Sequence, residues 1–148
     1  MSIIERSIIL KVNKEIAFSY FVEHELITKW LCGDAIINPV TEGAYELFWD
    51  LEDRNHNSTI GCRIQSIDQP NYLSFDWKGP VEFESFMNEA DPLTQVVVVF
   101  SEAEEGTKIT LLHNGWRHSD NWKEAKDYFD NAWFGAFQVL KELIDKSY

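Results

Sequence analysis

The chain has 148 residues, the usual size of one domain, so we expect a single domain over residues 1–148. Its formal net charge of −12 argues against a nucleic-acid partner and against an anionic membrane surface. Both attract clusters of Lys and Arg, whereas the 13 basic residues here are scattered among 25 acidic ones. Aromatic residues make up 14% of the chain, and such rings either dominate a core or line a pocket within it.

The N-terminus carries Glu5 and Arg6 where a secretory signal would need an apolar stretch. No run approaches the roughly 18 apolar residues of a membrane span, and the longest is Val96–Phe100. Cys32 and Cys62 form no Cys-x-x-Cys motif and lie in apolar contexts, which favours buried, reduced thiols. We therefore predict a cytoplasmic protein.

The first forty residues predict a strand followed by two short helices. Ile3–Val12 is rich in Ile and Leu and is typical of a strand, and Asn13 then stands where a helix N-cap belongs. Apolar residues recur at helical spacing from Ile16 to Phe21, and a break is expected near Glu23–His24. A second helix is predicted over Leu26–Leu31, which includes Trp30.

From residue 34 to residue 113 the pattern changes to strands and polar turns. Alternating apolar and polar residues predict a strand over 59–67. The same alternation predicts a second strand over 72–78, with Leu73, Phe75 and Trp77 on one face. Tyr45, Leu47 and Trp49 share a face in the same way. Residues 79–93 are less regular and are expected to form a loop with a ragged strand. Residues 94–100 and 108–113 are predicted as the last two strands.

The clearest helix covers residues 121–146. One stripe at i, i+3, i+4 spacing contains Trp122, Ala125, Phe129, Ala132, Trp133, Ala136, Phe137, Leu140, Leu143 and Ile144. An antiparallel sheet with one apolar face needs a cover, and this helix is the longest predicted element. We therefore predict an α+β helix-grip fold, in which a curved antiparallel sheet of six to seven strands wraps the C-terminal helix.

Three segments carry a resemblance to a known family: ELITKWL at 25–31, GCRIQSIDQPNYLSFDW at 61–77 and GTKITLLHNGW at 106–116. With the order of elements, they resemble the START-like (SRPBCC) superfamily. Within it, the chain is similar to the AHSA-type family, the homologues of the activator of the heat-shock ATPase. The resemblance implies an elongated cavity between the sheet and the terminal helix, in which members bind apolar small molecules.

Three functions follow as hypotheses. The first is non-catalytic binding of an apolar or aromatic small molecule in that cavity. The second is an interaction module, including a chaperone-accessory role by analogy with the family. The third is a cyclase or hydrolase on the same scaffold. Each is compatible with a monomer or a homodimer.

Catalytic motifs give little support to the third hypothesis. The sequence contains no Gly-x-Ser-x-Gly, His-Glu-x-x-His or phosphate-binding loop, and His113 and His118 are poorly spaced for a metal. We expect no metal and no cofactor. His113 ends a strand, where it either points into the cavity mouth or is hydrogen-bonded at a rim.

The aromatic residues are the main candidates for a ligand site, although close packing into a core is the competing interpretation. Arg63 is added because, if it points inward, it anchors a polar head group. The predicted ligand-binding residues are Trp30, Trp49, Arg63, Phe75, Trp77, His113, Phe129, Trp133 and Phe137.

Overall fold

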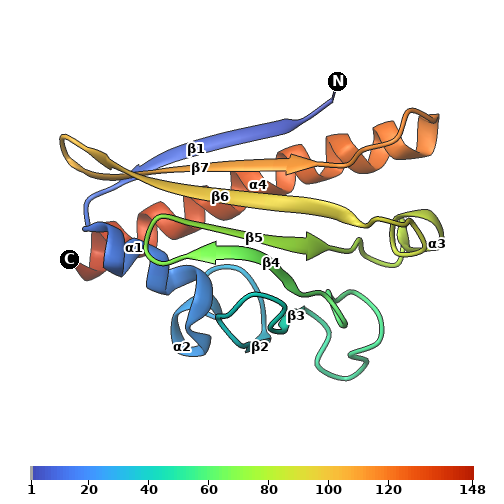
Figure 1. Ribbon diagram of the computed structural model, residues 1–148, viewed down its shortest axis with the longest axis horizontal. Coiled ribbons are helices and arrows are strands. Elements are labelled where there is room, and N and C mark those ends of the chain that lie inside the picture. Colours follow the sequence, from blue (N-terminus) through green and yellow to red (C-terminus); the bar gives the residue numbers. More distant parts are fainter. Residues whose placement is uncertain (1) are drawn as a thin grey trace.

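The structure, a computed structural model, describes residues 2–148. Strands and helices follow one another in the order that the sequence predicts, with one additional short helix (Figure 1). The elements are β1 (Ile4–Leu10), α1 (Lys14–Val22), α2 (His24–Ile27), β2 (Asp34–Ile37), β3 (Tyr45–Phe48), β4 (Ile64–Asp68), β5 (Tyr72–Trp77), α3 (Glu84–Met87), β6 (Thr94–Ala103), β7 (Gly106–Asn114) and α4 (Asp120–Ser147).

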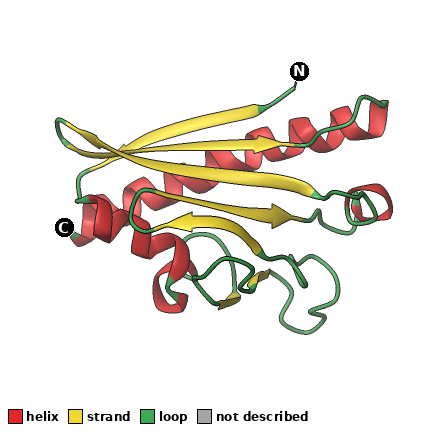
Figure 2. Ribbon diagram, in the orientation of Figure 1, coloured by secondary structure: helices red, strands yellow, loops and turns green. Residues whose placement is uncertain are grey.

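The strands form two antiparallel sheets, and α4 runs across one face of the larger one (Figures 1 and 2). The larger sheet has five strands in the order β1-β7-β6-β5-β4, and β2 and β3 form a second, two-stranded sheet. Isolated bridges between Ala44 and Arg63 and between Phe48 and Ser58 connect β3 with the segment before β4. The predicted α+β helix-grip fold is confirmed, with its seven strands divided between two sheets.

Local sequence signals account for the edges of several elements. The Asn13 side-chain oxygen accepts a hydrogen bond from the Ile16 backbone N–H at 2.9 Å, so Asn13 caps α1 as expected. Gly106 starts β7 with φ of +151°, and a Cβ there would lie 2.1 Å from the Leu10 carbonyl oxygen. Only glycine allows this close approach of the β6–β7 turn to the end of β1.

Two predicted strands are wrong in part. Alternation over residues 59–67 suggested one strand, but β4 begins only at Ile64, because Gly61 has φ of +85° and Cys62 closes a turn onto Thr59. Residues 79–93 contain the helix α3 and no strand. The Asn88 side chain holds this segment in a loop by bonding to both the N–H and the carbonyl of Gly79.

The core lies between the larger sheet and α4. Leu73, Phe75 and Trp77 of β5 all face it, as alternation predicts. Strand register aligns Phe75 with Val96, and Val96 with His113, so one buried row crosses three strands. The buried face of α4 contains Trp122, Ala125, Phe129, Trp133, Phe137, Leu140 and Ile144.

An ion pair connects α4 with the edge of the sheet. The Arg6 Nε of β1 lies 2.9 Å from the Asp130 carboxylate, and its guanidinium stacks over the Phe134 ring at 5.0 Å.

Across residues 2–148, none of the helices combines the length and apolar character needed to cross a bilayer.

Candidate functional site

A pocket of about 430 Å³ opens between the end of β5 and the middle of α4. This volume falls in the range of small-molecule sites, about 300–1,000 Å³. Four segments supply its walls: α4, the end of β5 with the turn that follows, the loop between β3 and β4, and the segment between α2 and β2. Its lining residues are Leu31, Trp49, Asp50, Asn57, Ser58, Trp77, Lys78, Gly79, Pro80, Tyr128, Phe129, Ala132, Trp133 and Ala136.

Four of the nine predicted ligand-binding residues meet at this pocket: Trp49, Trp77, Phe129 and Trp133. Trp77 is their centre, with its ring centroid 5.0 Å from Trp133, 5.9 Å from Trp49 and 6.2 Å from Phe129. Trp49 was expected to share a face with Tyr45 and Leu47, both of which are buried. Its own side chain is 43% exposed, because β3 ends at Phe48.

Three other predicted residues belong to the packed core and not to the pocket lining. Trp30 is buried and donates its indole N–H to the Tyr20 carbonyl at 2.9 Å. Phe75 stacks on Tyr45 with a centroid distance of 4.0 Å, and Phe137 packs 6.4 Å from Trp30. These three rings are therefore packed in the core, which is the alternative to a ligand site that the sequence analysis left open.

Arg63 does not point inward, so its expected role as an anchor in the cavity is wrong. Its side chain is exposed and donates to the Glu42 backbone carbonyl at 2.9 Å. The cause is strand register: Arg63 alternates with the buried Cys62 and Ile64, so these neighbours take the inner face.

His113 is fully buried in the core and lies outside the pocket lining. Its Nδ1 accepts the Trp133 indole N–H at 3.1 Å, so the ring proton is on Nε2, which donates to the Thr94 hydroxyl at 3.1 Å. Burial lowers the pKa of His113 to about 3, because the charged form loses its water. At neutral pH this histidine is a neutral structural bridge between α4 and the sheet.

Part of the pocket lining consists of residues that the sequence pattern does not mark as ligand-binding. Ala132 and Ala136 were placed in the stripe of α4, but their small size, which leaves the pocket open, was not recognised as a signal. Lys78 and Pro80 follow β5. Pro80 lies in the irregular segment 79–93, and Lys78 directly precedes it, so apolar periodicity does not predict which way either side chain points. Tyr128 precedes Phe129 and packs against it with ring centroids 5.0 Å apart, while remaining 45% exposed.

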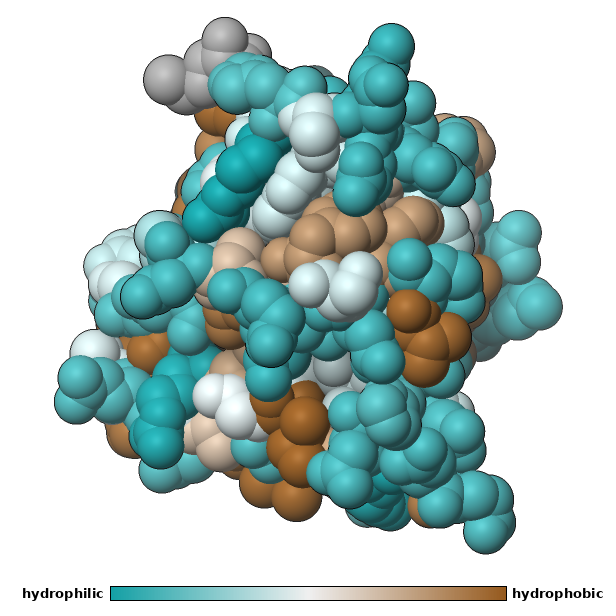
Figure 3. All heavy atoms as spheres, turned by 90° about the vertical axis from the view of Figure 1, so that its right-hand side faces the viewer, coloured by the Kyte–Doolittle hydropathy of each residue, from teal (hydrophilic) through white to brown (hydrophobic). Residues whose placement is uncertain are grey.

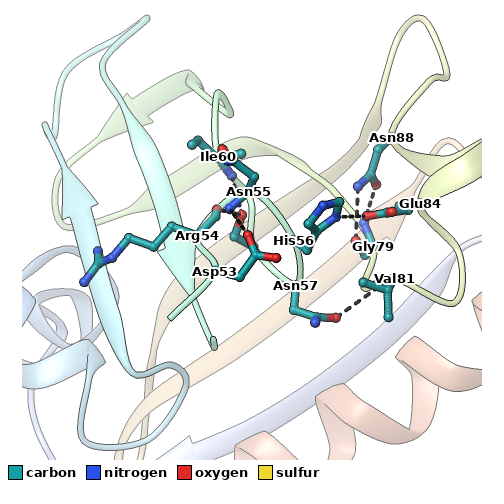
Figure 4. Close-up of polar contacts among 11 residues, drawn as sticks. Asp53, Arg54, Asn55, His56, Asn57, Ile60, Gly79, Val81, Glu84 and Asn88 are labelled. Atoms are coloured by element: carbon teal, nitrogen blue, oxygen red, sulfur yellow. Dashed lines mark hydrogen bonds and ion pairs between the residues drawn. The ribbon is translucent and has the colours of Figure 1, made fainter. Parts of the chain in front are cut away.

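One wall of the pocket is held by contacts between two loops (Figure 4). The His56 Nδ1 lies 2.9 Å from a Glu84 carboxylate oxygen, and the Asn57 side-chain oxygen accepts the Val81 N–H at 3.0 Å. The Glu84 carboxylate raises the pKa of His56 above its usual value. These contacts tie the β3–β4 loop to the segment that carries α3.

The end of the molecule that carries α3 and the start of α4 has a mixed surface. Apolar residues interrupt a largely hydrophilic face there (Figure 3). Beside the pocket, Val81 and Tyr128 are each 45% exposed. The pocket is therefore bordered by apolar side chains that remain in contact with solvent.

Two donors beside the pocket have unusual surroundings. The buried Trp77 indole N–H has no hydrogen-bond partner among residues 2–148, whereas Trp49 donates to the Leu31 carbonyl and Trp133 to His113. Lys78 Nζ donates to the Ile60 carbonyl at 2.7 Å and forms no ion pair within the described chain. Both side chains contribute to the lining.

Other reactive groups lie elsewhere. Cys32 and Cys62 are buried free thiols, and burial raises the pKa of each to about 12. Over residues 2–148 no three His, Cys, Asp or Glu side chains gather as a metal site would require.

Comparison with known structures supports the fold independently. Protein MLL2253 from Mesorhizobium loti is 15% identical, with 99% of each chain covered and a TM-score of 0.79. The Aha1 dimer from Colwellia psychrerythraea is 14% identical, with 97% of this chain and 96% of that chain covered and a TM-score of 0.74. DynU16, a putative protein in the dynemicin biosynthetic locus, is 11% identical; 98% of this chain and 48% of that chain are covered, with a TM-score of 0.71.

No curated protein matches the chain significantly. A family model does match it, over residues 11–145, and this family is described as Activator of Hsp90 ATPase homolog 1-like protein. The match covers most of the chain and agrees with both the order of elements and the solved structures. The chain therefore belongs to the Activator of Hsp90 ATPase homolog 1-like family, within the SRPBCC-type superfamily.

Proposed function

We propose that this protein binds an apolar or aromatic small molecule, without transforming it, in the pocket between the end of β5 and α4. The observation that carries the proposal is the 430 Å³ space bordered by the rings of Trp49, Trp77, Phe129 and Trp133. Aromatic walls with a few polar groups are typical of sites that hold a flat apolar ligand.

The lining favours binding over catalysis. Its ionisable side chains among residues 2–148 are Asp50, Lys78 and Tyr128. An enzyme on this scaffold needs a titratable group such as a histidine inside the pocket, whereas His113 is buried in the core and hydrogen-bonded at both ring nitrogens. We therefore propose that the pocket binds an apolar ligand selectively and transfers no proton to or from it.

A fluorescence titration tests the proposal. N-phenyl-1-naphthylamine, a neutral apolar dye, should bind with 1:1 saturation and quench the pocket tryptophans. The matched variant is Ala132→Leu, which fills the pocket from α4 and should abolish saturation. Mass spectrometry of small molecules released on denaturing the purified protein gives an independent readout. Absence of saturable binding by any apolar probe, together with no released molecule, would exclude the function.

A chaperone-accessory role is the second candidate, because the family is named after an activator of the Hsp90 ATPase. The name is an analogy between family members and does not depend on the pocket. The steady-state ATPase rate of Hsp90 should rise on adding this protein. An unchanged rate at saturating protein would remove this candidate and leave the binding proposal intact.

A further inference from the structure

We infer that the ligand of this pocket carries an anionic oxygen, or at least a carbonyl oxygen, which Lys78 and the Trp77 indole N–H hold at the end of β5. The inference rests on the proposed function, because it specifies the chemistry of the molecule that the same pocket binds. It predicts a flat apolar body with one oxygen acceptor at one end.

Lys78 is a positively charged side chain of the pocket without a carboxylate partner among residues 2–148. It is the cation of the pocket lining, it is partly buried, and its hydrogen bond to the Ile60 carbonyl uses one of its three N–H donors. The protein has 25 acidic residues, yet none within residues 2–148 pairs with Lys78. A partly buried ammonium without a carboxylate partner is suited to an anion supplied from outside the chain.

The Trp77 indole N–H is a buried donor without an acceptor among residues 2–148, and this observation is independent of Lys78. A buried donor without an acceptor is unfavourable, because it loses its hydrogen bond to water, so native proteins rarely retain one without a reason. Four other tryptophans donate to an acceptor of the protein: Trp30, Trp49, Trp116 and Trp133. Trp77 lines the pocket, as Trp49 and Trp133 do, but its buried N–H has no acceptor among residues 2–148.

Lys78 directly follows Trp77 at the end of β5, and both residues contribute to the pocket lining, so the oxygen of the ligand is placed at this end of the pocket. Asp50 is the carboxylate of the lining, and it opposes an anion there. One of its oxygens already accepts the Glu52 N–H at 3.0 Å. The oxygen of the ligand is therefore expected at the Lys78 side of the pocket, away from Asp50.

The net charge of the protein opposes the binding of an anion, so a measured preference for an anion would have to come from the pocket itself. A chain with net charge −12 repels anions at long range, so an unspecific surface effect would favour a cation. Preference for an anion over a neutral molecule of the same shape requires a local cation. Lys78 is the residue that supplies it.

Calorimetric titration with three naphthalenes of similar shape tests the inference. Wild-type protein should bind 2-naphthoate about tenfold more tightly than 2-ethylnaphthalene, with 2-acetylnaphthalene between them. Lys78→Met should remove the advantage of 2-naphthoate and leave 2-ethylnaphthalene within about twofold. Trp77→Phe, which keeps a ring but removes the donor, should weaken both oxygen-bearing probes by about threefold to tenfold.

Matched controls separate local from general effects. Lys146→Met removes an exposed charge near the far end of α4 and should leave all three affinities unchanged. Lys78→Arg, which retains the charge, should retain the preference for the anion, and thermal unfolding shows whether each variant is folded. Equal binding of 2-naphthoate and 2-ethylnaphthalene by wild-type protein would overturn the inference. Failure of all three probes to bind would instead count against the proposed function.

Discussion

The contact between α4 and the sheet is closed around His113 and open around Ala132. At the closed part, Trp133 and His113 are joined by a hydrogen bond, and Phe129 packs 5.6 Å from the same imidazole. At the open part, α4 presents alanines opposite the end of β5, where the chain turns away at Gly79 and Pro80. Trp77, Phe129 and Trp133 belong to both parts: they pack against the core and also border the pocket.

This comparison shows how one amphipathic helix serves two purposes. Its large residues Phe137, Leu140 and Ile144 are buried and pack into the core against the sheet. Ala132 and Ala136 lie opposite the point where β5 has ended, and the space there remains open, whereas the equally small Ala125 is buried in the core. Residue size along the helix, combined with the position of the strand ends, therefore separates core from pocket.

The largest expected effect on stability comes from removing Trp133, which packs in the core and also borders the pocket. Trp133→Ala removes a buried ring and leaves the His113 Nδ1 without its donor. We expect a loss of about 3–5 kcal/mol in the free energy of unfolding, measured by urea denaturation. Trp49→Ala, at the exposed edge of the pocket, should cost less than about 1 kcal/mol. Equal losses in the two variants would mean that core and pocket do not differ as described.

The closed part should also respond to acid. The pKa of His113 is about 3 in the fold and returns to the ordinary histidine value of 6.5 on unfolding, so below pH 6.5 the unfolded chain binds the extra proton. The stability due to its neutral form is complete above about pH 6.5 and is lost as the pH falls. At pH 5 we expect a loss of about 2 kcal/mol from this group, seen as the wild-type difference between pH 7.5 and pH 5.

The matched variant for the acid experiment is His113→Gln, which can keep an acceptor for Trp133 and a donor for Thr94 but has no proton to gain. Other titrating groups are common to both proteins, so they cancel in the comparison. If the variant loses as much stability as the wild type between the two pH values, His113 is not the origin of the effect.

The open part is tested by filling it. Ala132→Leu adds a branched side chain to the pocket from an exposed position of α4, so stability should change by less than about 0.5 kcal/mol. Affinity for N-phenyl-1-naphthylamine should fall at least about tenfold, as followed by fluorescence. Unchanged affinity in a folded variant would place the dye elsewhere.

The outer face of α4 should give the smallest effect. A Cβ added at the exposed Gly135 meets nothing within 4 Å, so Gly135→Ala adds helix propensity without a clash. We expect thermal unfolding to show a gain of about 0.5–1 kcal/mol, with dye affinity unchanged. A loss of stability would indicate that this glycine has a role that its surroundings do not reveal.

Much of the fold could be predicted from periodicity. The stripe over residues 121–146 corresponds to α4 within one residue at each end, since the hydrophobic face of a long helix recurs over many turns. The strand with Leu73, Phe75 and Trp77 was equally clear. The strand predicted over residues 59–67 is wrong in its first half, because alternating residues also occur in a turn and the pattern does not reveal the positive φ of Gly61.

The candidate site was predictable only in part. Aromatic content and the α4 stripe pointed to Phe129 and Trp133, but they gave no means of separating these from Phe137, which lies one turn further along in the packed core. Arg63 depended on strand register, where a shift by one residue reverses the face of the side chain. Lys78 was missed, because no short-range signal connects a strand end with the helix opposite.

The sequence by itself therefore determined the elements, their order and the face of α4 that meets the sheet, since each of these follows from local spacing of apolar residues. The tertiary structure alone decided where that contact is closed and where it is open. That outcome depends on side-chain volumes and strand ends that the fold brings together from distant parts of the sequence, such as Trp77 and Trp133. It also decided which buried donors were left without an acceptor, because a hydrogen bond depends on distance in space.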